Sequence, residues 1–276
     1  MAYGTLAHTV GCKPLAELTR TLASYDIDFV QLALSKAISD IDTGLGRLSH
    51  GLAHHIGEQF QRSGVRIGVL GCYIDPIHPD PAQRRREIDR FKEHLRFARQ
   101  LGVPMVATET GDLHTYRQQY PGSYIDKGYE VLRETVLELA EEAEKWGVYA
   151  AIEPVCRHTL SSPERMMQLL EEIPCSCIGV VLDPCNLLDE RNLDRQDEVI
   201  DQAFSLFGDR IVLAHIKGLV YQDGKLVETK PGESEFHLAR FLKLLASCKP
   251  FIDISIESTQ PHELNDTIRY LKQIAE

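Results

Sequence analysis

The chain has 276 residues, of which 43% are hydrophobic and 26% charged, and these ordinary proportions exclude a disordered chain and a fibrous protein. Its longest uncharged apolar run, about ten residues over 173–182, is well short of the ~20 that a membrane span needs. A net charge of −11 argues against a nucleic-acid binder, because such proteins neutralise phosphates with a basic surface.

The cysteines and the N-terminal segment favour the cytoplasm. Seven cysteines are too few for a disulfide scaffold, their number is odd, and no Cys-x-x-Cys pair occurs. Residues 1–10 have neither the basic start nor the apolar stretch of a secretory signal. We therefore expect a cytoplasmic protein with reduced thiols, without a membrane or nucleic-acid partner.

Short apolar runs and helical periodicities alternate along the whole chain. The apolar runs are often β-branched and predict strands of a sheet that is buried on both faces. These runs lie at 5–10, 28–34, 65–71, 104–110, 148–154, 178–184, 211–217 and 251–258. Apolar residues at helical spacing predict a helix after each run, at 15–22, 45–56, 88–98, 131–143, 162–170, 199–206, 241–245 and 264–271.

Eight strand–helix units are the pattern of a parallel (β/α)8 barrel, the TIM barrel. The length agrees, because one-eighth of the chain is about 34 residues and a βαβ unit takes roughly 30. A doubly wound sheet is the alternative, but no Gly-x-Gly-x-x-Gly follows the first strand. We expect residues 1–276 to form a single TIM-barrel domain, with a β-hairpin around Asp223-Gly224 inserted after the seventh strand.

Metal-capable side chains end the last four predicted strands, where barrel enzymes carry their reactive groups. Their separations are 30, 32 and 42 residues, which are one repeat, one repeat, and one repeat plus a hairpin. Equal spacing by repeat places them at one height around the barrel. Three carboxylates and one imidazole suit Mn²⁺ or Mg²⁺ best, and Zn²⁺ or Co²⁺ next. The four residues are Glu153, Asp183, His215 and Glu257.

These segments resemble the xylose isomerase-like barrels, the sugar (phosphate) isomerase/epimerase superfamily that also includes endonuclease IV. The resemblance covers nearly the whole chain and is strongest in AAIEP, VVLDP, LAHIKG and ISIES, with the turn at 231–234. It implies that Glu153, Asp183, His215 and Glu257 bind one divalent cation. By likeness to ketose epimerases, it also implies that Glu153 and Glu257 exchange the proton beside the carbonyl. A metal can stabilise the enediolate, and two carboxylates can serve its opposite faces.

Other residues near the strand ends are candidates for binding the substrate. Many family members have His where this chain has Asn186, and the second strand often ends in Glu where this chain has Gln31. Asn186 can hydrogen-bond a hydroxyl or carbonyl oxygen, but it is a poor metal ligand. Lys217 could bind a substrate oxygen or stabilise an oxyanion. The remaining candidates follow strands four, three and one, respectively: Glu109, His78 and His8.

A second cluster competes with this site. His50, His54 and Glu58 are four residues apart, so they share one face of a helix. The zinc motif His-Glu-x-x-His is absent, and the second helix should lie outside the barrel. We interpret this cluster as a solvated helix face.

The resemblance implies a metal-dependent isomerase or epimerase of a small sugar, sugar phosphate or related polyhydroxy carbonyl compound. A dehydratase of a keto-cyclitol or dehydro-acid is the alternative, because it shares the proton abstraction. An endonuclease IV-like DNA repair enzyme is less favoured, because Asn186 and the acidic charge suit neither a three-metal site nor a DNA-binding face. A sugar-binding barrel without turnover is a further alternative. The hairpin at 219–230 could serve either as a lid or as an interface in a homo-oligomer.

Overall fold

The computed structural model describes residues 1–275, and its centre is a closed barrel of eight parallel strands. Around the barrel the strands follow the order β1-β10-β7-β6-β5-β4-β3-β2. Every neighbouring pair is parallel, which requires a crossover between successive strands. The barrel strands are β1 (Ala2–Leu6), β2 (Phe29–Leu32), β3 (Arg66–Gly71), β4 (Met105–Glu109), β5 (Tyr149–Glu153), β6 (Ile178–Leu182), β7 (Ile211–Ile216) and β10 (Asp253–Ile256).

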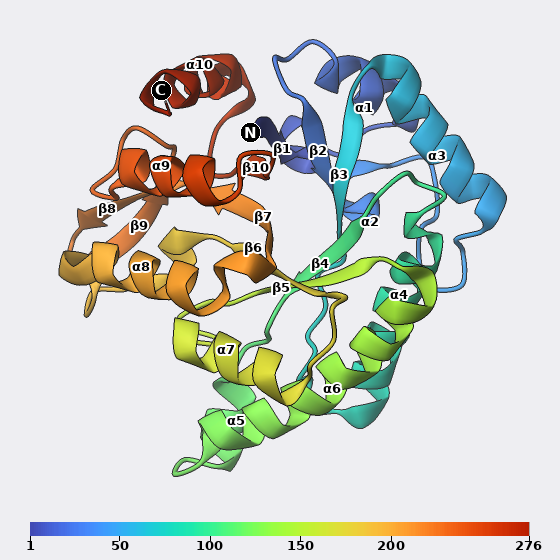
Figure 1. The fold of residues 1–276 in the computed structure, drawn as a ribbon. Helices are drawn as coiled ribbons and strands as arrows, with labels where there is room; N and C mark the ends of the chain where they lie inside the picture. Colours follow the sequence, from blue (N-terminus) through green and yellow to red (C-terminus); the bar gives the residue numbers. More distant parts are fainter. Residues whose placement is uncertain (276) are drawn as a thin grey trace.

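Helices form the crossovers and surround the barrel (Figure 1). Apolar faces of helices and strands pack together between the two layers, where most of the hydrophobic core lies. The helices are α1 (Leu15–Leu22), α2 (Leu34–Ala37), α3 (His50–Ser63), α4 (Pro81–Ala98), α5 (His114–Gln119), α6 (Tyr124–Trp146), α7 (Pro163–Glu172), α8 (Gln196–Phe207), α9 (Leu238–Cys248) and α10 (Leu264–Ile274). Short 3-10 turns are η1 (Ala7–Val10), η2 (Pro184–Leu187), η3 (Leu193–Arg195), η4 (Gly208–Arg210) and η5 (Pro261–Glu263).

The predicted (β/α)8 fold is confirmed, but two boundaries differ from the expected ones. The first strand ends at Leu6, and the chain then turns through η1 to Gly11, whose φ of 89° suits glycine. The second predicted helix starts later than Leu45, at His50, because the Ser49 side chain accepts a hydrogen bond from Leu52 N and caps the helix there. His8 therefore lies in a turn above the strand.

One end of the barrel interior is filled and closed. The Phe29 ring packs inside with Val69, Met105 and five other apolar residues of the barrel strands: Ala107, Ala151, Val181, Leu213 and, in part, Val212. Gly68 leaves the space that this ring needs, since a Cβ there would lie 2.5 Å from it. Arg66 lies over the same ring and forms an ion pair with Asp253 at the amino ends of the strands. Open space for a ligand is therefore expected at the carboxyl ends.

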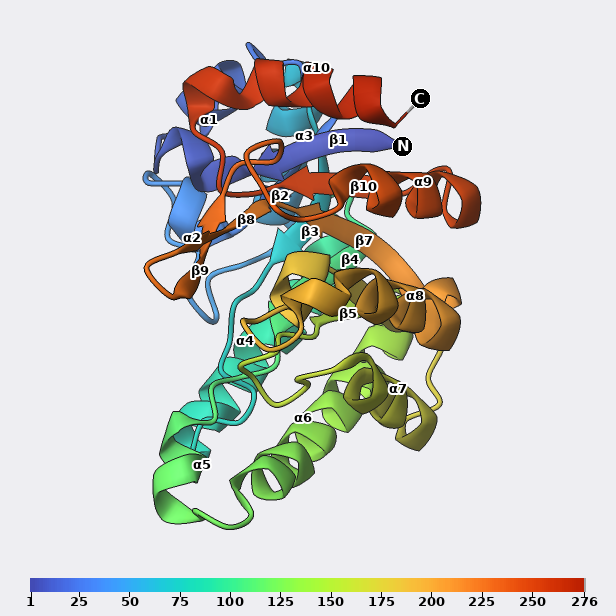
Figure 2. The ribbon, with the colours of Figure 1, turned by 90° about the vertical axis from the view of Figure 1, so that its left-hand side faces the viewer.

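The predicted hairpin follows β7. Strand β8 (Gly218–Gln222) pairs antiparallel with β9 (Lys225–Thr229). Asp223 and Gly224 join them with φ values of 51° and 80°, as a type I′ turn requires. Figure 2 shows the hairpin on the same side of the barrel as α2, which follows the carboxyl end of β2.

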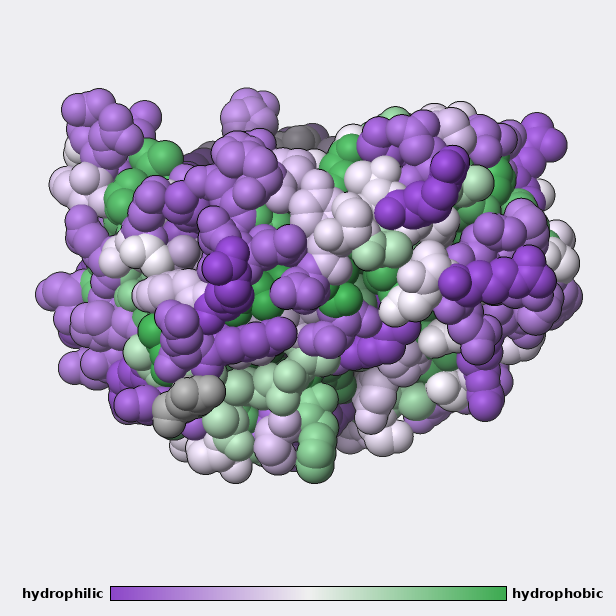
Figure 3. Space-filling view, turned by 90° about the horizontal axis from the view of Figure 1, so that it is seen from above, coloured by the Kyte–Doolittle hydropathy of each residue, from purple (hydrophilic) through white to green (hydrophobic). Residues whose placement is uncertain are grey.

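The outer helices present polar surfaces. Seen from the side of α10, α1 and α3, the surface is mostly hydrophilic with scattered apolar patches (Figure 3). Among residues 1–275, no helix combines the length and the apolar character that crossing a membrane would take.

Candidate functional site

The four predicted metal ligands meet at the carboxyl ends of β5, β6, β7 and β10. Suitable ligand atoms of Glu153, Asp183 and His215 all lie within 4.8 Å of one another, and all three residues are buried. Glu257 joins them, because its Oε1 lies 3.2 Å from Nδ1 of His215. We call these four residues the ligand cluster. The strand ends bring them together from positions 104 residues apart in the sequence.

The His215 ring is oriented from both sides. Its Nδ1 faces two carboxylates, at 3.5 Å from Glu153 Oε1 and 3.2 Å from Glu257 Oε1. Its Nε2 lies 2.9 Å from Oε1 of Gln31, whose Nε2 donates to the Tyr73 hydroxyl at 2.8 Å. A histidine that binds a metal usually donates its other ring N–H to an acceptor, which fixes the tautomer. Gln31, only 1% exposed, supplies that acceptor from the opposite side of the barrel.

Asn186 and Lys217 connect the carboxylates. Asn186 follows Asp183 in the turn η2, where it donates to Glu153 Oε1 at 2.7 Å. Its Oδ1 accepts a hydrogen bond of 2.7 Å from Lys217 Nζ. The same ammonium lies 3.4 Å from Asp183 Oδ2 and 3.7 Å from Glu257 Oε2. Two of the five predicted substrate-binding residues, Asn186 and Lys217, are thus placed against the ligand cluster.

The hairpin adds a residue that the sequence patterns did not single out. Glu228 in β9 lies 2.8 Å from Lys217 Nζ through its Oε1. It is more than half exposed, whereas Lys217 is buried. The hairpin therefore covers this part of the rim and pairs with the buried ammonium.

Burial and neighbouring charges act on these groups in opposite directions. Burial raises the pKa of Asp183 to about 6, although the Lys217 ammonium opposes the rise. Burial would also raise the pKa of Glu257, but His215 and Lys217 outweigh it and hold that pKa at about 2. Burial lowers the pKa of His215, yet Glu153 and Glu257 together raise it well above its usual value. Several negative charges thus gather among buried groups, with His215 and Lys217 as the positive charges against them.

The ligand cluster fits a divalent cation. Asp183 Oδ2 and His215 Nδ1 are buried without a hydrogen-bond partner among the described residues. Charged groups lie 3.2–3.5 Å from these two atoms but without hydrogen-bond geometry, and because buried polar atoms are normally satisfied, this indicates a further partner. Three carboxylates and one imidazole are ligands that bind Mn²⁺, Mg²⁺ or Zn²⁺. The residues present therefore suit one divalent metal ion.

A cavity of about 310 Å³ opens beside the ligand cluster, over the half of the barrel mouth that the first four strands form. Glu257 of the ligand cluster lines it, together with two residues that the sequence predicted as substrate-binding, Glu109 and His8. Two further lining residues, Lys36 and Tyr73, were not predicted from the sequence. Glu109 pairs in register with Glu153 across β4 and β5. Burial, and then the Glu153 charge, raise its pKa, and His158 Nδ1 lies 3.4 Å from its Oε2.

His78 is placed differently from the other candidates. Its Nδ1 accepts a hydrogen bond of 3.2 Å from Asp80 N, and its carbonyl accepts one from Arg84. These contacts fix the loop that leads into α4. The described contacts of His78 are thus with its own loop and not with the ligand cluster.

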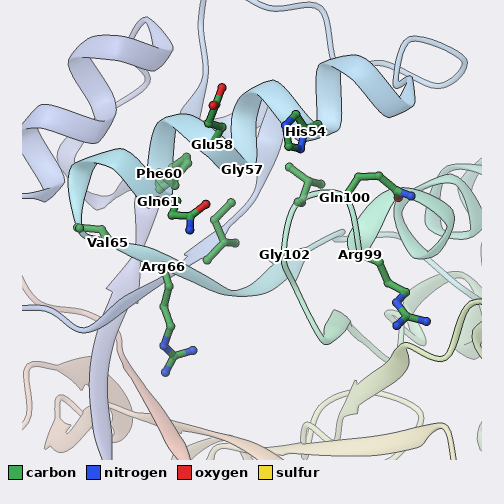
Figure 4. A pocket seen from close by; sticks show the side chains of 13 residues that line it. His54, Gly57, Glu58, Phe60, Gln61, Val65, Arg66, Arg99, Gln100 and Gly102 are labelled. Carbon is green, nitrogen blue, oxygen red and sulfur yellow. The ribbon is translucent and has the colours of Figure 1, made fainter.

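A larger hollow, of about 480 Å³, lies far from this chemistry. It is lined by the ends of α3 and α4 and by the start of β3 (Figure 4). His54 and Glu58 belong to α3 there, and Figure 4 shows Arg66 and Arg99 pointing away from that helix. Glu58 pairs with Arg62. His50 and His54 are exposed and Glu58 is half-buried, and the interpretation of this helix face as solvated stays a prediction.

Comparisons with known proteins agree with this fold. The model of one family, described as xylose isomerase-like TIM barrel, matches residues 20–274. No curated protein matches the chain by sequence. Solved structures match the fold over nearly its whole length.

A D-tagatose 3-epimerase-like protein is 18% identical, with a TM-score of 0.77 over 99% of this chain and 97% of its own. A 3-keto-D-glucoside 4-epimerase, YcjR from E. coli, is 12% identical, with a TM-score of 0.77 over 99% of each chain. The IolI protein with a bound zinc atom is 18% identical, with a TM-score of 0.73 over 99% of this chain and 96% of its own.

Proposed function

The chain belongs to the xylose isomerase-like TIM barrel family, and we propose that it is a divalent-metal-dependent isomerase or epimerase of a small polyhydroxy carbonyl compound. One observation carries the proposal. Glu153 and Glu257, from separate strands, face the same ring nitrogen of His215 at 3.5 and 3.2 Å inside a buried site. Two carboxylates so arranged can act on the two faces of one carbon. The names of two similar structures, a tagatose 3-epimerase-like protein and a ketoglucoside 4-epimerase, support the same reaction class.

The metal belongs to this proposal. Glu153, Asp183, His215 and Glu257 would hold one ion, with Mn²⁺ or Mg²⁺ as the favoured choices. When bound, the ion would stabilise negative charge that develops on the substrate oxygen.

The chain's own residues would move the proton. One of the two carboxylates removes the proton from the carbon beside the carbonyl, and a planar enediolate results. The other carboxyl group, which carries a proton of its own at the start, donates that proton to the opposite face; this inverts the carbon and leaves the protonation states of the two groups exchanged. Asn186 holds Glu153 by donating to its Oε1, and His215 and Lys217 keep Glu257 in its ionised form.

Lys217 and Glu109 would bind substrate oxygens. The ammonium of Lys217 is buried among acceptors and supplies a positive charge for an oxygen that becomes negative. Glu109 lies in the cavity wall next to Glu153, where it can hold a hydroxyl group. The cavity extends from the ligand cluster toward β1 and β2 and defines the direction in which the substrate would lie.

A dehydratase is the second candidate, and one observation favours it. Burial and the charge of Glu153 raise the pKa of Glu109, and His158 adjoins it, so this pair can donate a proton. Loss of a hydroxyl group as water needs such a donor in addition to the base.

Product analysis separates these candidates. Metal-loaded protein is incubated with ketoses, ketose phosphates and inososes, and the products are identified by NMR and mass spectrometry. We expect an isomer or epimer of unchanged mass and about one metal ion per chain. Loss of water would favour the dehydratase, and about three ions per chain would favour the endonuclease IV-like alternative.

We further propose that the protein works in the cytoplasm. All seven cysteines are free, which fits a reducing compartment. A homo-oligomer stays a prediction, and measurement of the mass in solution would test it.

A further inference from the structure

The cavity beside the ligand cluster is lined by two chemically different sets of residues. Glu109 at the end of β4 and Glu257 after β10 provide carboxylates at its two flanks, since β4 adjoins β3 and β10 adjoins β1. His8, Lys36 and Tyr73 line the side that the segments after β1, β2 and β3 form. We call these three residues the donor wall. Its members lie far apart in the sequence and converge only because the barrel closes.

Tyr73 is arranged to donate its hydroxyl proton into the cavity. If Nδ1 of His215 binds a cation, the proton of the ring is on Nε2. This N–H needs an acceptor, so the side-chain oxygen of Gln31 is the atom that faces His215. The amide nitrogen of Gln31 is then left for the Tyr73 oxygen, to which it donates at 2.8 Å. The phenol accepts from one side, and its own proton is free for a ligand in the cavity that Tyr73 lines.

His8 adds a second donor. Its Nδ1 is buried and has no hydrogen-bond partner among the described residues. Burial and the adjacent Lys36 charge lower the pKa of His8, so the ring is mostly neutral near pH 7 and can donate one N–H. Because Nδ1 is closed off even without a ligand, the ring nitrogen that a ligand in the cavity could reach is Nε2.

Lys36 adds a positive charge. Its Nζ lies 4.2 Å from the centre of the Tyr73 ring, so a cation–π contact holds the ammonium at the cavity. Across residues 1–275, no carboxylate oxygen lies within 4.0 Å of this nitrogen. The nearest acid of the cavity, Glu257, contacts His215 and Lys217 instead. The charge of Lys36 is therefore available to a ligand.

We propose that the donor wall binds an anionic oxygen group of the substrate, carboxylate or phosphate, in the cavity beside the ligand cluster. The substrate is then a sugar acid or a sugar phosphate and not a neutral sugar. An ammonium, a phenol and an imidazole line the same cavity, and charge-assisted hydrogen bonds to an oxyanion are the strongest that such donors make. This inference rests on the proposed function only for the identity of the ligand as substrate.

Binding of unreactive compounds tests the donor wall without any need for turnover. Metal-loaded protein is titrated in a calorimeter with a hexonate, a hexitol 6-phosphate and the uncharged hexitol. We expect at least one anionic compound to bind about tenfold or more tightly than the hexitol. Comparison of the two anionic compounds separates carboxylate from phosphate. Equal affinity for all three compounds, or no binding of either anion, would overturn the proposal.

Matched variants assign the effect to the donor wall. Lys36→Met should lower the affinity for the anionic compound about tenfold or more, because it removes the positive charge and keeps most of the aliphatic part of this exposed side chain. Lys243→Met, on the exposed face of α9, is the control for a general change in net charge. Tyr73→Phe, which removes the phenol hydroxyl, should also lower the affinity for the anionic compound. Equal effects of the Lys36 and Lys243 variants would contradict a specific subsite.

Kinetics then distinguish failure of the subsite from failure of the proposed function. With a keto-hexuronate or a ketose phosphate as substrate, Lys36→Met should raise KM far more than it lowers kcat. Its effect on a neutral ketose should be at least about tenfold smaller. Proton exchange that is equally fast for neutral ketoses would overturn the subsite and leave the function standing. Anion binding that depends on Lys36, without proton exchange in any compound, would support the subsite and overturn the proposed function.

Discussion

Replacement of Gln31 tests how the candidate metal ligand His215 is held. The Gln31 side chain is buried and makes two contacts, 2.9 Å to His215 Nε2 and 2.8 Å to the Tyr73 hydroxyl. Gln31→Met keeps the length of the side chain and removes both polar groups. His215 then loses the acceptor that orients its ring, while the ligand cluster itself is unchanged.

The expected magnitudes follow from these contacts. Loss of a hydrogen-bond partner behind a metal ligand typically lowers metal affinity about 10- to 100-fold. This is about 1.4–2.7 kcal/mol of binding free energy. Each buried partner left without its hydrogen bond lowers the free energy of unfolding by about 1–3 kcal/mol. The metal-free variant should therefore be less stable than the wild-type protein, and metal should stabilise it less.

Two measurements on the purified proteins check this. Calorimetric titration with Mn²⁺ gives the dissociation constant, and thermal unfolding with and without Mn²⁺ gives the stabilisation by metal. For a chain of this length, the metal-induced rise in Tm should shrink by roughly 3–11 °C in the variant. Gln273→Met on α10, an exposed position, is the matched control and should leave both values unchanged.

A second substitution at the same position separates the two contacts. Gln31→Glu keeps an acceptor for His215 but cannot donate to Tyr73, so metal affinity should stay within about threefold of wild type or increase. An unchanged Mn²⁺ dissociation constant in Gln31→Met would refute the inferred orientation of His215. A large loss of Mn²⁺ affinity in Gln31→Glu would also refute this orientation of His215.

The remaining predictions concern stability and metal removal. Phe29→Ala should lower the free energy of unfolding by about 3–5 kcal/mol in urea denaturation, because the ring fills the barrel interior, and a loss below about 1 kcal/mol would contradict this packing. Burial lowers the pKa of His94 from 6.5 to about 4. The unfolded state therefore binds the proton more readily, and the free energy of unfolding falls by roughly 3 kcal/mol as the pH drops from above 6.5 to below about 4. The stability of His94→Gln should therefore fall less between pH 7 and pH 4, and parallel pH curves for the two proteins would contradict the buried, neutral histidine. A chelator should lower the Tm of metal-loaded wild-type protein but not that of Asp183→Asn, and an equal decrease in both would argue against this ligand.

The barrel could be predicted because its signals are local. Each strand is an apolar run, each helix has an apolar stripe, and the repeat length limits the topology to eight units. The height of the ligand cluster follows from the same spacing, since parallel strands end on one face. The hairpin was predictable from one dipeptide, Asp223-Gly224, whose backbone has the positive φ angles of its turn type.

The contacts across the barrel could not be predicted in this way. Gln31 and His215 lie on β2 and β7, which are not neighbours in the sheet and meet only through the interior. The partners Tyr73 and Lys36 come from segments beyond the strand ends, where no periodicity fixes the position of a side chain. Closure of the barrel selects these pairs. The departure of Gln31 from the usual Glu was the one signal in the sequence that pointed to this contact.

Wash-in of deuterium from solvent tests the central claim most directly. Metal-loaded protein is incubated in D₂O with a ketose, a ketose phosphate and a keto-acid, and deuterium at the carbon beside the carbonyl is measured by NMR. Wild-type protein should introduce one deuterium at that carbon of a substrate, and Glu153→Gln and Glu257→Gln should each remove this activity while they remain folded. Exchange that persists in both variants would contradict proton transfer by this pair of glutamates.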